Sequence, residues 1–228
     1  MRIDKMLSQL NYGSRQEIKK MAKKGFIFCN QKRVDDVSMH IDPERDEIMV
    51  NQEVVFYKNT FLLKIYKPVG YECSHKQVLY PSVIDLIKEP YQRFDLNIAG
   101  RLDVDAEGLV LITNDGALQH QITHPKKHLV KHYEVTLDRP FKHEEALLAG
   151  VSIKDGHNQP YIAKALSVKT EDTYVKITID EGKFHQVKRM FEAVGYKVTH
   201  LKRTQIGNIT LEDLKPGAYQ MVLLEDLK

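Results

Sequence analysis

The sequence predicts an α+β protein with a small module at residues 1–57 and a larger domain at residues 61–228. Two short amphipathic helical patterns and a hairpin pattern fill the front of the chain. After residue 61, strand-like runs alternate with only a few helical ones, which favours a mixed domain built on a largely antiparallel sheet. The polar tetrapeptide Tyr57-Lys58-Asn59-Thr60 separates the two parts.

The spacing of apolar residues predicts the first helix. Ile3, Met6, Leu7 and Leu10 recur at intervals of three and four residues, which places them on one helical face. The segment Asn11-Tyr12-Gly13 is expected to end this helix.

A second helix is expected directly after the first. Ser14 and Glu17 form the pattern of a capping box, in which each side chain bonds the backbone of the other residue. Gly25 suits a left-handed C-terminal cap. The expected apolar face consists of Ile18, Met21 and Ala22. The outer face is cationic and carries Arg15, Lys19, Lys20, Lys23 and Lys24.

A hairpin should follow, with strands at residues 26–29 and 33–34 and a turn at Asn30-Gln31, and residues 48–50 would add a strand. The front of the chain is basic, because residues 1–34 carry nine Lys and Arg against Asp4 and Glu17. The net charge of the whole chain is only +3, so this local excess carries more information than the average.

Expected elements of the larger domain follow the same periodicities. The predicted helices lie at residues 142–149 and 185–194. The predicted strands lie at residues 61–66, 130–137, 163–168, 174–179 and 219–224. After the first of these strands, Lys67-Pro68-Val69-Gly70 is predicted to form a turn.

The most informative segment runs from Gly100 to Gly108 and holds Arg101 and Asp103. On an extended backbone these two side chains would point to the same face. Asp103 could be a nucleophile, a base or only the ion-pair partner of Arg101, and the residues alone favour the surface pair. Asp105 and Asp115 are interpreted as solvated acids in turns.

Two later segments could contribute to the same site. Lys131 and Tyr133 share one face of a strand, where the tyrosine is either a core ring or a flat surface on which a base could stack. A helix opens after Gly182, and Lys188 lies three residues after His185 along it. Residues 183–203 hold six Lys and Arg against one Glu, a composition suited to a phosphate backbone.

The cysteine spacing and the lack of long apolar runs indicate the cellular compartment of the protein. Cys29 and Cys73 lie far apart and have no Cys-x-x-Cys spacing, so both are expected to be reduced thiols. The N-terminus lacks the apolar run of a signal peptide, and no stretch approaches about 18 consecutive apolar residues. We therefore expect a cytoplasmic protein without membrane contact. We also expect a monomer, because nothing in the sequence indicates an oligomer.

The front of the chain resembles the S4 RNA-binding domain. The matching residues are Arg2-Ile3-Asp4-Lys5-x-Leu7, Ser14-Arg15-x-Glu17 and Gly25-Phe26-Ile27 with Asn30. Gln31 departs from this pattern, because the family commonly has glycine there. Such a module would bind RNA phosphates through its lysines and give affinity without much sequence reading.

The chain as a whole resembles the RsuA family of pseudouridine synthases, which pair an S4 domain with a catalytic domain. The motifs that carry the resemblance are Lys67-Pro68-x-Gly70, Gly100-Arg101-Leu102-Asp103, Gly108-Leu109 through Thr113-Asn114-Asp115-Gly116, Lys131-x-Tyr133 and Gly182-x-x-His185-Gln186-Val187-Lys188-Arg189-Met190. Ala106 departs from the pattern, because the family often has threonine at this position.

This resemblance implies the chemistry. A uridine within RNA would lose its N1–C1′ bond, the uracil would turn, and C5 would bond to C1′. Asp103 would be the nucleophile, although attack on C1′, attack on C6 and assisted elimination all remain open. Lys188 would keep Asp103 ionised, and Tyr133 would stack on the uracil and could help remove the C5 proton. Arg101 would help replace the uridine after it is flipped out of the helix.

The resemblance also assigns RNA contacts and no cofactor. No metal is expected, and Pro125 argues against one continuous helix that would align His124, His128 and His132 as ligands. Besides Arg101 and the cationic face of the second helix, the RNA contacts are Lys131, Lys183, His185, Gln186 and Arg189.

The motifs around Gly182 and Gly207 look more like the enzyme for small-subunit (16S) rRNA than the large-subunit enzymes. The expected partner is therefore 16S rRNA or a small-subunit assembly intermediate. A large-subunit (23S) rRNA synthase and a non-catalytic S4-type RNA-binding or assembly factor are the alternatives.

Overall fold

The computed structural model describes residues 1–227 except 77–78 and 125–126. It divides into two compact units. The first unit comprises Met1–Phe61 and Ile87–Leu96, and the second comprises Leu62–Leu86 and Asn97–Lys228. The segment Ile87–Leu96 lies inside the sequence of the predicted larger domain but belongs to the first unit.

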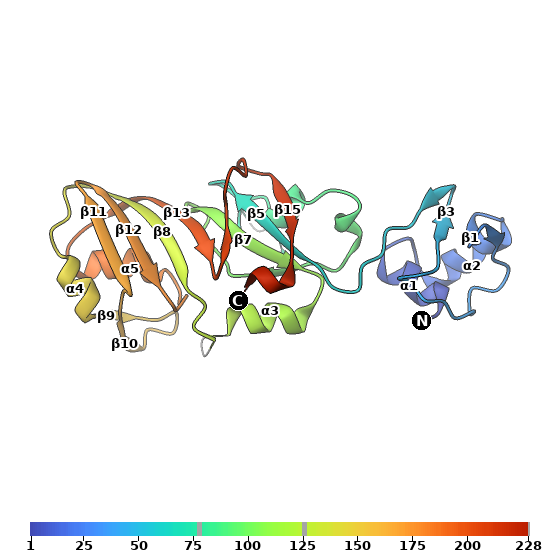
Figure 1. The fold of residues 1–228 in the computed structure, drawn as a ribbon, viewed down its shortest axis with the longest axis horizontal. Coiled ribbons are helices and arrows are strands. Elements are labelled where there is room, and N and C mark those ends of the chain that lie inside the picture. Colours follow the sequence, from blue (N-terminus) through green and yellow to red (C-terminus); the bar gives the residue numbers. More distant parts are fainter. Residues whose placement is uncertain (77–78, 125–126, 228) are drawn as a thin grey trace. The chain divides into compact units, whose positions relative to one another are not determined.

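Two helices and a small sheet form the first unit (Figure 1). Its strands are all antiparallel and follow the order β2-β1-β3-β4. The apolar faces predicted for the two helices face the core, because Ile3, Leu7 and Ile18 are fully buried. The elements are α1 (Ile3–Gln9), α2 (Arg15–Lys23), β1 (Ile27–Cys29), β2 (Lys32–Arg33), β3 (Ile48–Val50) and β4 (Glu53–Val54).

Local capping and turn signals in the first unit are confirmed. The Ser14 hydroxyl accepts from the Glu17 backbone N–H at 3.3 Å, and the Ser14 N–H donates to Glu17 Oε2 at 2.7 Å. The predicted hairpin turn holds Asn30 at φ 48° and Gln31 at φ 65°. Two successive left-handed residues are typical of the type I′ turn, so Gln31 adopts the conformation that glycine would favour.

Aromatic rings join the segment Ile87–Leu96 to the rest of the first unit. The Phe61 ring lies edge-to-face against Tyr91 and Phe94, with centroids 5.1 and 5.0 Å away. The Arg93 guanidinium lies 4.3 Å from the centre of the Tyr12 ring. This packing explains why a segment distant in sequence shares the core of the first unit.

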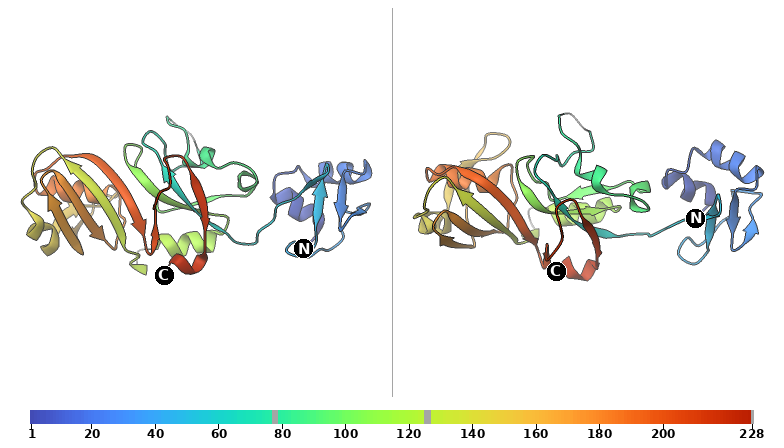
Figure 2. Two further views of the ribbon diagram at one scale, coloured as in Figure 1. Left: turned by 45° about the horizontal axis from the view of Figure 1, so that its top comes forward. Right: turned by 90° about the horizontal axis from the view of Figure 1, so that it is seen from above.

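A nine-stranded sheet, ordered β11-β12-β8-β13-β7-β5-β15 with β14 beside β13 and β6 beside β7, forms the second unit (Figures 1 and 2). All neighbours are antiparallel except β13 and β7, which are parallel. The strands are β5 (Leu62–Lys67), β6 (Asn97–Ala99), β7 (Glu107–Thr113), β8 (Lys131–Leu137), β11 (Ser167–Glu171), β12 (Tyr174–Ile179), β13 (Val198–Ile206), β14 (Ile209–Thr210) and β15 (Tyr219–Val222). The predicted α+β class with a largely antiparallel sheet is confirmed.

Helices pack on this large sheet, and the small sheet of β9 and β10 contacts helix α5. Helix α3 contacts β6 and β7, α4 contacts β11, and α5 contacts β9 and β13. The two helices predicted at 142–149 and 185–194 are confirmed as α4 and α5. The remaining elements are α3 (Gly116–Thr123), α4 (Glu144–Ala149), α5 (Gln186–Ala193), β9 (Val151–Lys154), β10 (Pro160–Ala163), η1 (Val83–Leu86), η2 (Tyr91–Arg93) and η4 (Leu224–Leu227).

The strand predicted at residues 163–168 is wrong. Strand β10 ends at Ala163 in the small sheet with β9, and β11 begins at Ser167 in the large sheet. Between them the Ala165 N–H donates to the Leu147 carbonyl of α4 at 2.9 Å. The apolar run is therefore a crossing between two sheets, and its backbone bonds to a helix instead of a neighbouring strand.

None of the described helices is long and apolar enough to cross a membrane. Cys29 and Cys73 are both free and buried.

Candidate active site

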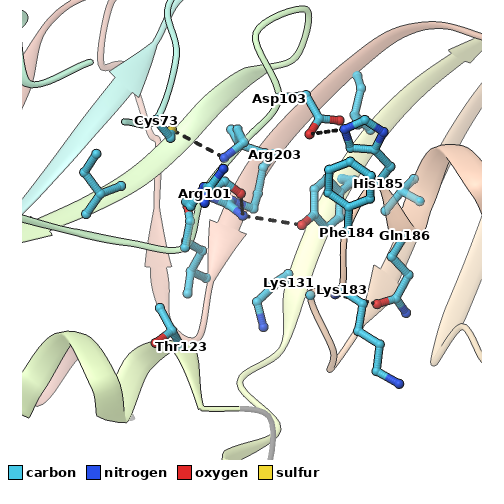
Figure 3. A pocket seen from close by; sticks show the side chains of 18 of the residues that line it. Cys73, Arg101, Asp103, Thr123, Lys131, Lys183, Phe184, His185, Gln186 and Arg203 are labelled. Carbon is cyan, nitrogen blue, oxygen red and sulfur yellow. Dashed lines mark hydrogen bonds and ion pairs between the residues drawn. The ribbon is translucent and has the colours of Figure 1, made fainter. Parts of the chain in front are cut away.

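A cavity of about 1050 Å³ lies in the second unit. It is bounded by α3, the loop that precedes β7 and the loop that precedes α5, and side chains from these segments point into it (Figure 3). Eight of the predicted site residues line it: Arg101, Asp103, Lys131, Tyr133, Lys183, His185, Gln186 and Lys188. Residues from three separate sequence motifs therefore meet around one space.

Asp103 lies on an irregular loop between β6 and β7, so the extended segment predicted here is wrong. Gly100 takes φ +86°, a left-handed conformation that turns the chain away from β6. The loop is held from two sides, because the Gly70 N–H donates to the Val104 carbonyl at 2.8 Å and the Leu102 N–H donates to Cys73 Sγ at 3.4 Å. Within it the Ala106 N–H donates to the Asp103 carbonyl at 3.2 Å.

The Asp103 carboxylate contacts the side chains of Lys188 and His185. Lys188 Nζ lies 2.9 Å from Asp103 Oδ2, and His185 Nε2 lies 3.1 Å from Oδ1 (Figure 3 draws the His185 contact). Arg101 takes part in none of the ion pairs given by the described residues. The Arg101–Asp103 ion pair that the residues alone favoured is therefore not formed. Asp103 instead pairs with Lys188, as the family resemblance implied.

Asp105 is more than the solvated turn acid expected from the sequence. Its side chain is 68% exposed, yet its Oδ1 lies 2.5 Å from Lys188 Nζ. Burial alone would raise the pKa of Asp105, but the hydrogen bond and charge of Lys188 lower it below its ordinary value. Asp115, by contrast, caps α3 by accepting from the Ala117 and Leu118 N–H groups.

Lys188 is a shared cation. Burial would lower its pKa, but hydrogen bonds to Asp105 and Asp103 more than offset burial and raise the pKa above the ordinary lysine value. The ammonium group is therefore charged at neutral pH and supplies the positive charge that a carboxylate at this site needs.

His185 takes a left-handed conformation with φ 52° directly before α5. Its ring stacks on Phe184 with centroids 3.8 Å apart, and this conformation points the imidazole at Asp103. Gln186 is 3% exposed and bonds within its own loop, where it accepts from the Lys183 N–H and donates to Glu181. Lys183 lies over the Tyr161 ring, with Nζ 3.5 Å from the ring centre.

Lys131 and Tyr133 project from β8 into the cavity. Tyr133 is 6% exposed, so its ring forms part of the cavity wall and the core at once. Lys131 Nζ donates to the Leu129 carbonyl at 2.6 Å. Burial, helped by the charge of Arg203, lowers the pKa of Lys131 to about 8.

The remaining predicted contacts lie outside the cavity. Arg189 donates to the Lys154 and Asp155 carbonyls and lies over the Phe184 ring. Of the three histidines considered as metal ligands, His124 lines the cavity and packs against His120, whereas His128 contacts Asp180 and His132 contacts Thr178. Pro125 lies outside the described residues. The cationic face predicted for α2 is present, and its members are exposed: Arg15, Lys19, Lys20, Lys23 and Lys24.

Two cations beside the loop of Asp103 are buried, which the sequence analysis did not predict. Arg203 is 2% exposed and donates to backbone carbonyls of this loop and of β7. Lys67 is fully buried and donates to the Pro68 and Tyr71 carbonyls at 2.9 Å. Burial lowers the pKa of Lys67 to about 8. Lys67 begins the Lys67-Pro68-x-Gly70 motif and Arg203 lies in the basic segment 183–203, but neither pattern indicates that the side chain is buried.

Comparison with known proteins identifies the family of the chain. Residues 62–193 match the family model described as RNA pseudouridylate synthase, and residues 1–48 match the S4 domain. The chain belongs to the RNA pseudouridylate synthase family. It is therefore an isomerase, and its predicted resemblance to the RsuA family is confirmed by the relatives below.

Curated relatives match the whole chain. It is 39% identical over its full length to an uncharacterized RNA pseudouridine synthase, YtzG, of Bacillus subtilis, covering 97% of that protein. It is 37% identical, again over its full length, to the ribosomal small subunit pseudouridine synthase A of Escherichia coli, covering 98% of it. A crystal structure of a pseudouridylate synthase aligns with a TM-score of 0.66 at 34% identity, over 100% of this chain and 98% of the other.

Proposed function

We propose that this chain converts one specific uridine of 16S ribosomal RNA to pseudouridine. The observation that carries this proposal is the Asp103 carboxylate, which borders a large cavity and lies 2.9 Å from Lys188 Nζ. The full-length relatives named ribosomal small subunit pseudouridine synthase A support the choice of substrate.

Asp103 acts as the nucleophile in this proposal. The N1–C1′ bond of the uridine breaks, the detached uracil turns, and C5 bonds to C1′. The C5 hydrogen then leaves as a proton and N1 gains one, so the reaction is an isomerisation without oxidation or reduction. A carboxylate suits this chemistry because it can bond to carbon and leave again. Lys188 Nζ, 2.9 Å from Asp103 Oδ2, places a positive charge beside this carboxylate.

Tyr133 and Arg101 serve the flipped nucleotide. The uridine must leave its stack to reach Asp103, which costs a few kcal/mol. The Tyr133 ring lines the cavity and offers a flat surface for the uracil, and in this proposal Tyr133 also helps to remove the C5 proton. Arg101 is exposed at the cavity, where it can take up the space left in the RNA.

The two predicted domains divide the work in this proposal. Residues 61–228 carry the chemistry, and residues 1–57 hold RNA phosphates with the cationic face of α2. Those side chains are exposed, as a phosphate-binding surface requires.

The experiment is carbodiimide mapping of pseudouridine in the rRNA of cells lacking the gene. The deletion strain is complemented with the wild type, Asp103→Ala or Asp103→Asn. We expect one 16S site to lose its pseudouridine and to regain it only with the wild type. Purified Asp103→Asn should still bind 16S rRNA, because it keeps the shape of the loop and all the cationic surfaces.

Other results lead to different conclusions. A site lost from 23S rRNA would move the substrate to the large subunit. An unchanged pseudouridine map, together with full complementation by Asp103→Asn, would leave a non-catalytic RNA-binding factor as the function.

A further inference from the structure

Arg203 connects three parts of the site with one side chain. Its Nε donates to the Leu109 carbonyl of β7 at 2.8 Å. Its Nη2 donates to the Gly100 carbonyl, and its Nη1 donates to the Arg101 carbonyl at 3.4 Å. The same Nη1 lies 3.5 Å from the Tyr133 hydroxyl.

The charge of Arg203 is unusual for its position. The side chain is 2% exposed, and it takes part in none of the ion pairs given by the described residues. Backbone carbonyls therefore satisfy a buried cation, which is a costly arrangement compared with an apolar side chain of similar size. Its charge also helps to lower the pKa of Lys131. Packing alone does not account for an arginine here.

We propose that Arg203 is a positioning residue that fixes the Asp103 carboxylate relative to the Tyr133 ring. By holding the carbonyls of Gly100 and Arg101 it sets the backbone three and two residues before Asp103. By contacting Leu109 and Tyr133 it ties that backbone to β7 and β8. The inference rests on the proposed function, in which the uridine must fit between the carboxylate and the ring.

Guanidinium geometry suits this role. It is planar and presents its N–H groups as a rigid fork, so several acceptors are held in fixed relative positions. An ammonium group is a point charge on a flexible stem and cannot reach the Gly100, Arg101 and Leu109 carbonyls at once. Arg203→Lys therefore keeps the charge and removes the positioning.

The test compares Arg203→Lys with the matched control Arg139→Lys. Arg139 also donates to a backbone carbonyl, that of Gly195, but it does not line the cavity. We expect Arg203→Lys to lower kcat about 100-fold, because a shift of about 1 Å in a reacting group has this effect. KM and the Kd for RNA should stay within about threefold of the wild type, since the RNA-facing cations are unchanged. Arg139→Lys should leave kcat unchanged.

A second variant covers the case in which Arg203→Lys does not fold. Gly100→Ala disturbs the same contact from the loop side, because alanine is strained at the φ of +86° that Gly100 adopts. The new β-carbon itself would fit, since its nearest neighbour, Arg203 Nη2, is 3.5 Å away. We expect the same loss of kcat with unchanged Kd. Full kcat in whichever of these variants folds, or a parallel loss of kcat and RNA affinity, would overturn the proposal.

A wrong proposed function would give a different result from a wrong positioning role. In that case the wild type itself forms no pseudouridine in 16S rRNA, whatever the variants do. A wild type that is active, alongside an equally active Arg203→Lys, rejects the positioning role alone.

Discussion

Gly108 and Arg203 meet backbone to backbone where β7 and β13 run parallel. A β-carbon on Gly108 would lie 2.2 Å from the Arg203 carbonyl oxygen, and Gly108 takes φ +114°. These two residues are register partners in a parallel pairing that joins two antiparallel halves of the large sheet. The site depends on this contact, because the Asp103 loop precedes β7 and Arg203 belongs to β13.

Gly108→Ala should therefore destabilise the second unit. The clash is with backbone, which cannot move aside cheaply, and the left-handed conformation adds strain. We expect the free energy of unfolding to fall by about 3 kcal/mol in urea denaturation. Gly116→Ala is the matched control, because its β-carbon meets nothing within 4 Å and helix α3 favours alanine by up to about 1 kcal/mol. Equal stability of the two variants would contradict the prediction.

Burial of Lys67 predicts a pH dependence of stability. Its pKa falls from 10.5 to about 8 in the folded chain, so the unfolded chain binds more protons between these values. The free energy of unfolding should then rise with pH across this window, by up to about 1.4 kcal/mol per pH unit for this one group. Below the window both states are protonated, and the cost of the buried charge is constant.

Lys67→Met and Lys67→Arg test this relation together. Methionine is neutral and arginine is charged throughout the window, so neither titrates there. Each variant should therefore show a flatter rise of stability with pH than the wild type in urea denaturation measured every half pH unit. A rise as steep in both variants as in the wild type would show that other groups cause it.

Much of the fold follows from local patterns. The apolar spacing of Ile3 and Leu7 and the Ser14–Glu17 capping box lie within single elements, and the structure reproduces them. The prediction of one strand at residues 163–168 is wrong, because an apolar run indicates that residues are buried but not which sheet their backbone joins. The segment Ile87–Leu96 could not be placed from local patterns either, since its aromatic partners are far away in sequence.

In the candidate site too, local motifs point to some residues, whereas others depend on contacts between distant parts of the chain. Asp103, Tyr133 and Lys188 come from motifs, and the structure brings all three to one cavity. Arg203 was counted among the cations of a basic segment, because its burial arises only when β13 pairs with β7 and β8. Asp105 was interpreted as solvated for a similar reason, since its partner Lys188 is 83 residues away.

The shared position of Lys188 predicts different losses for its two carboxylate partners. Asp105 is largely exposed, so its ion pair is worth at most about 1 kcal/mol, and Asp105→Asn should lower kcat no more than about fivefold. Lys188→Met removes the cation beside Asp103, the proposed nucleophile, and should lower kcat by about 100-fold or more. Single-turnover assays on 16S rRNA measure both. If Asp105→Asn were as inactive as Asp103→Asn, Asp105 would have to be included in the chemistry.

The cationic face of α2 predicts a change in the salt dependence of RNA binding. Substituting Gln for Lys19, Lys20, Lys23 and Lys24 should weaken binding for all RNA sequences alike and make the plot of log K against log salt shallower. If each lysine neutralises one phosphate, the slope should change by about 3, because each contact contributes roughly 0.7 to 0.9. Filter binding at four salt concentrations measures the slope. The matched control substitutes Gln for four exposed lysines of the second unit, Lys142, Lys164, Lys169 and Lys176. It changes the net charge equally, so an equal change of slope in the control would assign the effect to overall charge and not to α2.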